Sequence, residues 1–144
     1  MTTFMKKVCA FVISAMCAIA LSGAALAPCA FATTGHWYFS FSKSDGVHKC
    51  GPVKKTNGNN YVNLSIKKSS DNVFTPGKSV LGLRARTSGN AKATAYHTYS
   101  YYTDSTNMTF KKDKAIVNHN YYLKGQIDSK SKTNLIQVWG YWTP

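Results

Sequence analysis

Basic and aromatic side chains are the residues of this chain best suited to binding chemistry. Arg84 and Arg86 lie two positions apart, so in an extended strand both would point to the same side. Adjacent rings such as Tyr101 and Tyr102 would point to opposite sides, so one of the two must face outward. Exposed rings beside cations suit stacking on sugars or bases, or a position at lipid headgroups. The candidate ligand-binding residues are Trp37, Arg84, Arg86, Tyr96, Tyr99, Tyr102, Tyr122, Trp139 and Tyr141.

Acidic residues are few, which argues against hydrolysis by paired carboxylates. That mechanism needs two acids roughly 5–10 Å apart around the scissile bond. The chain has no glutamate, and nearly all of its aspartates lie in turn sequences, where aspartate commonly shapes the turn. The five are Asp45, Asp71, Asp104, Asp113 and Asp128. We therefore expect no glycosidase activity, and more generally no enzyme.

Histidine and cysteine offer weaker signals. His48 and Cys50 would share one face of a strand, and a neighbouring cation could lower the pKa of the thiol. The flanking Gly46 and Gly51-Pro52 instead favour a loop or irregular edge, with Cys50 half-buried or available for an intermolecular disulfide. No two of the four histidines have metal-ligand spacing within one element, so we expect no metal and no cofactor. They are His36, His48, His97 and His119.

The first 32 residues are predicted to be a secretion signal. Lys6 and Lys7 precede a segment, 8–32, that has no charged residue, as in signal peptides. Ala30-Phe31-Ala32 supplies the small side chains that signal peptidase requires, so Thr33 would be the new N-terminus. The alternatives are a permanent membrane anchor, for which the run is long enough, and a lipoprotein attached at Cys29. We expect a secreted domain over residues 33–144.

Charge is the strongest remaining signal of the predicted mature segment. Two of the 18 lysines and arginines lie in the signal, which leaves 16 against five aspartates and a net charge of +11. Such a field attracts polyanions. The expected partners are an anionic cell-wall polymer, a glycan or a membrane surface, with nucleic acid less favoured. Of four cysteines only Cys50 remains, so it could link a dimer but form no internal disulfide.

The mature segment alternates apolar and polar residues with the period of a strand. Val62, Leu64 and Ile66 would face one side of a sheet, with Asn63 and Lys67 on the other. Turn sequences separate about eight candidate strands. They are 37–42, 61–67, 80–86, 91–102, 107–112, 114–118, 121–127 and 134–142. We predict an all-β domain, an antiparallel β-sandwich or jelly-roll-like barrel, preceded by an N-terminal signal helix.

Several short motifs also suggest a family. The chain resembles the YolA-like family of small secreted Gram-positive proteins of unknown function. The resemblance rests on the signal segment followed by Phe39-Ser40-Phe41, Tyr61-Val62, Tyr121-Tyr122-Leu123-Lys124-Gly125 and Val138-Trp139-Gly140-Tyr141-Trp142. It implies a compact β-sandwich and no assigned activity. A weaker similarity, through Gly35-His36-Trp37 and the late aromatic cluster, is to lactococcin-972-type bacteriocins.

Three functions follow from these patterns. The favoured one is a secreted, non-enzymatic module that binds an anionic or glycan surface through lysines and exposed rings. The second is a bacteriocin-like antibacterial protein, and the third is a small secreted hydrolase such as a ribonuclease, built on histidine and lysine. Against all three stands a purely structural interpretation, in which the rings pair across strands and the cations only keep the surface solvated.

Overall fold

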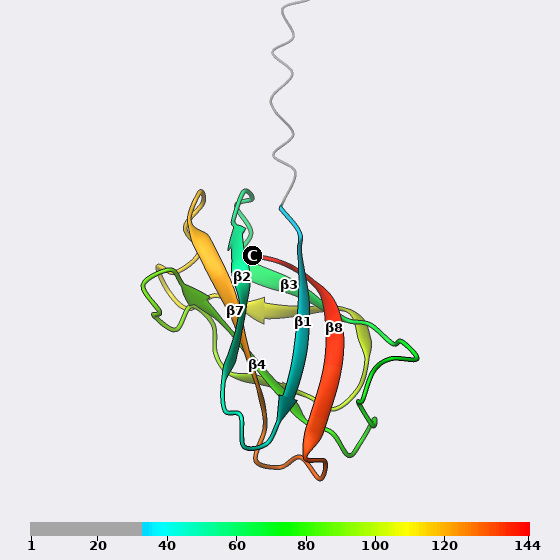
Figure 1. The fold of residues 1–144 in the computed structure, drawn as a ribbon. Helices are drawn as coiled ribbons and strands as arrows, with labels where there is room; N and C mark the ends of the chain where they lie inside the picture. Colours follow the sequence, from blue (N-terminus) through cyan, green and yellow to red (C-terminus); the bar gives the residue numbers. More distant parts are fainter. Residues whose placement is uncertain (1–32) are drawn as a thin grey trace, which may run out of the picture.

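The computed structural model describes residues 33–144, and the predicted signal segment 1–32 lies outside the described residues. Within 33–144 the chain forms eight strands and no helix (Figure 1). This part of the chain therefore has no membrane-spanning helix. The strands are β1 (Gly35–Ser42), β2 (His48–Lys54), β3 (Tyr61–Ile66), β4 (Leu81–Thr87), β5 (His97–Tyr99), β6 (Thr103–Thr109), β7 (Asn120–Ile127) and β8 (Leu135–Thr143). The expectation of an all-β domain of about eight strands is confirmed.

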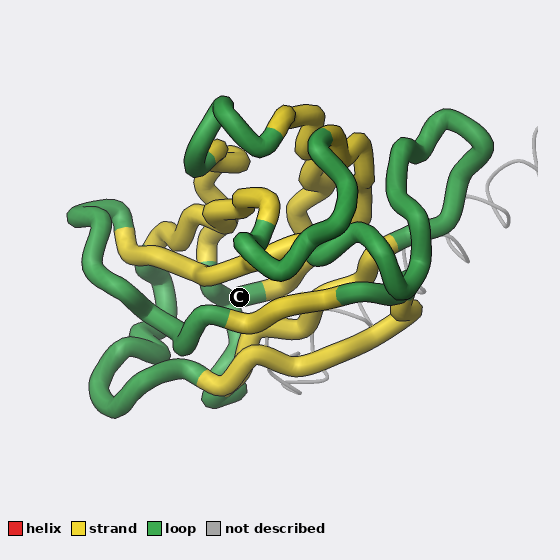
Figure 2. Tube along the Cα trace, turned by 90° about the horizontal axis from the view of Figure 1, so that it is seen from below, coloured by secondary structure: helices red, strands yellow, loops and turns green. Residues whose placement is uncertain are grey.

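Two four-stranded antiparallel sheets share one core. The first sheet has the order β1-β8-β3-β6 and the second has the order β2-β7-β4-β5. The loops lie around the outside of the strands (Figure 2). Consecutive strands therefore often lie in different sheets, so residues distant in sequence become neighbours. The pairing of β1 with β8, for example, joins the start of the domain to its end.

Alternation of buried and exposed residues along β1, β7 and β8 builds much of the core. In β1, Trp37, Phe39 and Phe41 are buried while the residues between them are not. In β7, Tyr121 and Leu123 are buried in the same way. These strands thus present one apolar face to the other sheet and one face to solvent, as expected for sheets that are covered on one side only, whereas β3 and β4 also bury Ser65 and Gly82 on the other face. Apolar burial replaces the stabilisation that a disulfide would give.

One predicted strand, 114–118, is wrong. This segment has no strand and ends in a turn. Asp113, just before the segment, and Asn118, its last residue, are non-glycine residues of positive φ (58° and 66°). The hydroxyl of the buried Tyr121 donates to the carbonyl of Lys114 and accepts from the backbone N–H of Ile116 at 2.9 Å. These bonds hold the segment in a closed turn, which the apolar residues at 115–117 do not reveal.

The long strand expected over 91–102 is also wrong in length. Only His97–Tyr99 forms a strand, β5. Before β5, the backbone N–H of Ala93 donates to the carbonyl of Ala85, and the carbonyl of Ala93 accepts the backbone N–H of Lys111. The chain here therefore bonds to two different segments and does not pair continuously with one strand. The strand that the sequence did not predict is β2, an edge strand whose pairing register shifts between Cys50 and Val53. The expected irregular edge around Gly51-Pro52 is this shift.

Candidate anion-binding face

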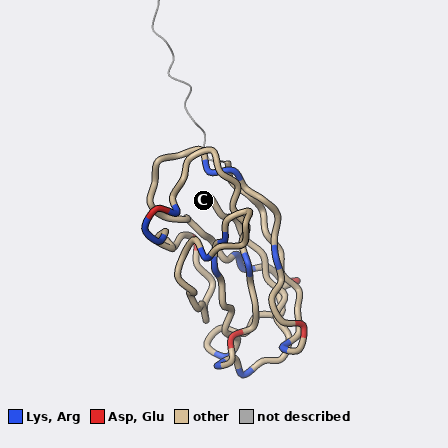
Figure 3. Tube along the Cα trace, turned by 90° about the vertical axis from the view of Figure 1, so that its left-hand side faces the viewer, with Lys and Arg blue, Asp and Glu red and all other residues tan. Residues whose placement is uncertain are grey.

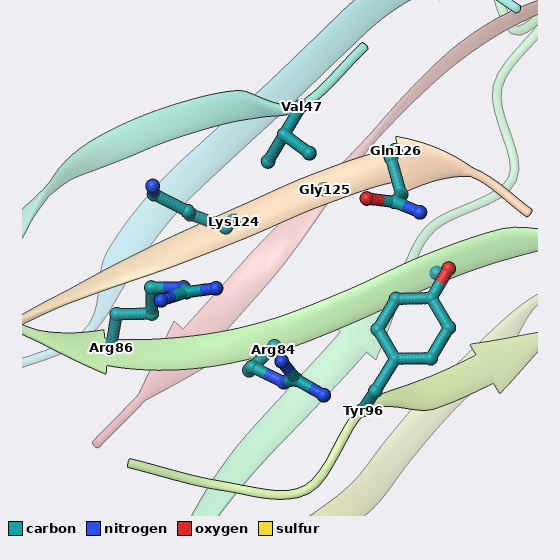
Figure 4. A pocket seen from close by; sticks show the side chains of 8 residues that line it. Val47, Arg84, Arg86, Tyr96, Lys124, Gly125 and Gln126 are labelled. Atoms are coloured by element: carbon teal, nitrogen blue, oxygen red, sulfur yellow. The ribbon is translucent and has the colours of Figure 1, made fainter. Parts of the chain in front are cut away.

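Three strands of the second sheet bring four cations together on its outer surface. Lys49 of β2 lies opposite Lys124 of β7, and Lys124 lies opposite Arg84 of β4. Paired strands are about 4.8 Å apart, so these three residues form a row of adjacent positive charges. Arg86 lies two residues beyond Arg84 on the same side of β4. The side chains of Arg84, Arg86 and Lys124 rise from the same side of the sheet (Figure 4).

We call these four cations, together with Tyr96 and Tyr122, the basic face. No carboxylate within residues 33–144 forms an ion pair with a cation of the basic face. The one ion pair in that part of the chain is Lys67–Asp104, at 2.8 Å. Positive positions greatly outnumber negative ones along the chain (Figure 3). Like charges directly opposite one another destabilise a sheet. The basic face therefore concentrates an electrostatic cost that no ion pair in the described chain offsets.

Tyr96 forms one border of the basic face and is fixed from two sides. Its hydroxyl donates to the Asp128 carboxylate at 3.0 Å, and the Arg84 guanidinium carbon lies 5.5 Å from the centre of its ring. Burial, reinforced by the Asp128 carboxylate, raises the pKa of Tyr96 to about 12. Asp128 also accepts the backbone N–H of Lys130 at 3.0 Å, so this nearest acid is engaged in shaping its own turn.

The other border is formed by Tyr122 and the turn after β4. The Lys49 ammonium lies 4.5 Å from the centre of the Tyr122 ring, within cation–π distance. Arg86 donates from Nη1 to the carbonyl of Asn90 at 2.7 Å. That bond closes the turn and fixes the guanidinium group. The cations are thus held by rings and a carbonyl, and their charges remain unneutralised.

Two neighbouring cavities open on the basic face, and both are bordered by Arg86 and Lys124. The smaller, of about 50 Å³, also contacts Arg84, Tyr96 and Gln126. The larger, of about 210 Å³, extends between Lys49 and the turn after β4. A water molecule needs roughly 10–15 Å³ of such volume, so the pair can hold several waters or oxyanion groups. The geometry suits consecutive anionic groups better than one large apolar ligand.

Comparisons with protein-family models, curated proteins and solved structures found no match to this chain. The basic face is therefore interpreted from its own geometry and charge.

The nine residues predicted to bind a ligand are divided among four places. Four of them, on the outer face of the second sheet, do come together: Arg84, Arg86, Tyr96 and Tyr122. Trp139 and Tyr141 lie on the outer face of the first sheet, beside a separate recess. Tyr99 and Tyr102 are partly buried against the core near the β5–β6 connection. Trp37 is fully buried, and its inclusion among surface residues is corrected.

Sequence reasoning missed Lys49 and Lys124, which complete the cation row. Lys124 could have been found, because alternation in the predicted strand 121–127 places it on the same side as Tyr122. Lys49 gave no such signal, since its segment was expected to be irregular. Neither residue could be placed beside Arg84 without the pairing of β7 with both β2 and β4.

His36, His48 and Cys50 lie near one another on β1 and β2, and His97 lies apart from them on β5. His48 packs against the ring of Phe41, with ring centres 5.2 Å apart, and Cys50 Sγ donates to the carbonyl of His36 at 3.6 Å. His97 is partly buried in β5, and burial lowers its pKa. Across 33–144 no group of three or more His, Cys, Asp or Glu is placed to hold a metal ion. The Cys50-linked dimer stays a prediction.

A glycine determines where Tyr96 lies, and we predict that Gly82→Ala disrupts the basic face. A Cβ at position 82 would lie 1.7 Å from the Tyr96 hydroxyl oxygen and 2.2 Å from the ring carbon that bears it, so the ring must move. Loss of its bond to Asp128 should cost about 1–3 kcal/mol of unfolding free energy. In a spectroscopic pH titration, Tyr96 should ionise nearer its ordinary pKa of 10 instead of about 12.

Gly51→Ala is the matched control, because a Cβ there meets no atom within 4 Å. It should leave both the thermal unfolding curve and the tyrosine titration unchanged. If Gly82→Ala matched the wild-type protein in both measurements, Tyr96 would not be packed across Gly82.

Proposed function

We propose that this protein is a secreted, non-enzymatic binding module that holds a phosphate-bearing cell-wall polymer on its basic face. The observation that carries the proposal is the row of Lys49, Lys124 and Arg84 across three strands, with no carboxylate paired to it within residues 33–144. Such a row is costly in the free protein. A bound polyanion would remove that cost and add attraction along the whole row.

Phosphate is the anion that suits the side chains best. The guanidinium forks of Arg84 and Arg86 match the geometry of phosphate oxygens, and Lys49 and Lys124 add mobile point charges. The Nε atoms of Arg84 and Arg86 are buried and lack an acceptor in the described chain, where Nη1 of Arg86, bonded to Asn90, is the one terminal nitrogen of the two side chains that has an acceptor. Free donors therefore remain on both arginines. Repeated phosphates along a polymer could occupy the two neighbouring cavities together.

The rings of the basic face favour a wall polymer over nucleic acid. Proteins that bind single strands offer open aromatic surfaces on which bases stack. Here Lys49 lies over Tyr122, and Arg84 lies over Tyr96. These cations occupy ring surfaces that bases would need, so the face supports charge recognition without stacking.

A membrane surface fits less well for a related reason. Peripheral attachment to lipid combines basic residues with several apolar side chains that enter the bilayer. Among the residues lining the two cavities, Val47, which is 55% exposed, is the one aliphatic side chain. The basic face thus supports an electrostatic partner in water.

Sequence features outside the basic face support the same proposal. The predicted signal in 1–32 would place the domain outside the cell, where such polymers occur. The motif resemblance to the YolA-like family agrees with a small secreted β-domain. The strand orders β1-β8-β3-β6 and β2-β7-β4-β5 support the jelly-roll form of the sandwich, which is common among lectin domains.

The test is retention on immobilised poly(glycerol phosphate) across a salt series. We expect strong retention at about 50 mM salt and little at about 500 mM, because screening weakens each charge contact. Unphosphorylated dextran should retain nothing through this face. Anionic vesicles and single-stranded DNA should compete only weakly with the polymer.

Tight binding to vesicles or DNA with none to the polymer would replace this proposal with the corresponding alternative partner. Retention that did not change with salt would contradict an electrostatic site altogether.

A further inference from the structure

A second recess, on the outer face of the first sheet, has a different chemistry. Its floor comes from paired residues of β1 and β8: His36 lies opposite Tyr141, and Tyr38 lies opposite Trp139. The centres of the His36 and Trp139 rings are 5.6 Å apart, and those of Trp139 and Tyr141 are 5.7 Å apart. Tyr38 and Tyr141 are 54% and 44% exposed. These four residues form a continuous aromatic floor that is open to solvent.

The loop between β3 and β4 forms the wall of this recess and is held beside β8. Lys67 donates its backbone N–H to Trp139 at 3.0 Å, and Val73 and Gln137 exchange two backbone bonds at 2.9 and 3.0 Å. Between these anchors, the chain from 68 to 72 projects beside the floor. The recess has a volume of about 400 Å³, within the usual range for small-ligand sites, roughly 300–1,000 Å³.

The wall presents mainly hydrogen-bond acceptors. The side-chain amide N–H of Asn72 donates to the carbonyl of Lys67 at 2.6 Å, and the amide oxygen has no partner within residues 33–144. One carboxylate oxygen of Asp71 accepts from Ser70 at 3.2 Å, and the other has no partner in the described chain. An acceptor-rich wall beside an aromatic floor needs a ligand with several donors. A sugar, with apolar ring faces and hydroxyl groups, has this combination.

Charge separates this recess from the basic face. No lysine or arginine lines it, although residues 33–144 carry a net charge of +11, and its one charged residue is Asp71. An anionic polymer would meet this carboxylate. A proline-rich peptide could stack on the rings, but its backbone offers mostly carbonyl acceptors, which would meet the acceptor oxygens of Asp71 and Asn72.

We propose that this recess binds an uncharged glycan, with a pyranose ring stacked on the aromatic floor and its hydroxyls donated to Asp71 and Asn72. The site is independent of the basic face and lies on the opposite sheet. One molecule could therefore hold a neutral polysaccharide on one side and an anionic polymer on the other.

The test uses tryptophan fluorescence of protein produced from the full chain. Trp37 and Trp142 are buried and Trp139 is not, so a bound sugar should change mainly the Trp139 signal. Cellohexaose, chitohexaose and mannohexaose are the probes. We expect a saturable change with at least one of them. Tyr38→Ala and Asp71→Asn should each weaken binding roughly tenfold, through lost stacking and a lost acceptor.

Two further variants serve as controls. Tyr101→Ala removes a ring that is 66% exposed outside the recess, and Arg84→Gln alters the basic face, so both should bind the glycan like the wild-type protein. The proposal fails if none of the three glycans gives a saturable change, or if Tyr38→Ala and Asp71→Asn bind as the wild-type protein does. A response to hexaproline or poly(glycerol phosphate) in place of the glycans would also overturn it.

Discussion

Replacing Arg84 and Lys124 with glutamine is expected to make the protein more stable and to weaken its binding to poly(glycerol phosphate) severely. Lys124 lies opposite both Lys49 and Arg84, so this double variant removes both cross-strand repulsions from the row. Each such pair costs about 0.2–1 kcal/mol. We expect a gain of about 1 kcal/mol in unfolding free energy, which raises the melting temperature by roughly 4 °C.

Binding should change in the opposite direction. Hydrogen bonds to charged groups contribute about 1.5–3 kcal/mol each, so losing two cations should weaken polymer binding by roughly a hundredfold or more. Added polymer should raise the melting temperature of the wild-type protein, because the folded basic face binds it more tightly than the unfolded chain does, and should change that of the variant much less. Differential scanning fluorimetry with and without polymer measures both effects.

Lys112→Gln with Lys130→Gln is the matched control, since it removes the same total charge from exposed positions elsewhere. This control should keep most of the polymer affinity and gain little stability. Arg84→Lys separates charge from shape, because it keeps the salt dependence but loses the planar fork. If the basic-face and control variants lost affinity equally, overall charge and not the basic face would hold the polymer.

Local alternation explains which parts of the fold could be predicted from the sequence. In 121–127 the apolar residues Tyr121, Leu123 and Ile127 fall at alternate positions, and 134–142 is rich in aliphatic and aromatic residues; the strands β7 and β8 follow almost these limits. The same period predicted that Arg84 and Arg86 lie on the solvent side of their strand, opposite the buried Leu83 and Ala85, and this is confirmed. A period of two is a property of the chain over a few residues, so no partner strand needs to be known.

Long-range pairing explains what could not be predicted. The basic face depends on β7 lying between β2 and β4, and β2 and β7 are about 70 residues apart in the chain. The aromatic floor likewise depends on the pairing of Tyr38 with Trp139. No local pattern encodes these registers. The turn at 114–118 was missed for a different reason, since it is held by the hydroxyl of Tyr121, a local side-chain contact that the pattern of apolar residues does not reveal.

Buried and exposed rings also look alike in sequence. Trp37 and Tyr38 are adjacent, and either could have faced outward. The structure buries Trp37 completely and leaves Tyr38 54% exposed. The choice is made by Gly140, which lies opposite Trp37 in β8 and leaves room for its ring. A Cβ at Gly140 would lie 2.8 Å from the Trp37 ring and 1.9 Å from the carbonyl oxygen of Ser65.

Trp37→Ala is accordingly expected to destabilise the fold severely. Truncating a buried tryptophan to alanine costs about 3–5 kcal/mol, because apolar surface is lost and a cavity remains. For a domain of this size the melting temperature should fall by roughly 12–20 °C. The indole nitrogen of Trp37 has no acceptor in the described chain, so the ring contributes by packing alone. Trp37→Phe should therefore retain much more of the stability than Trp37→Ala.

Tyr38→Ala is the neighbouring control, and it should change stability by no more than about 0.5 kcal/mol. The pair distinguishes a core ring from a binding ring. If Trp37 contacted a ligand, Trp37→Ala would lose affinity at an unchanged melting temperature. Because Trp37 lies between the sheets, we expect Trp37→Ala to lower the melting temperature. Molecules of this variant that are still folded at low temperature should keep their salt-dependent retention on poly(glycerol phosphate). The cations that hold the polymer project from the opposite side of the second sheet, away from Trp37.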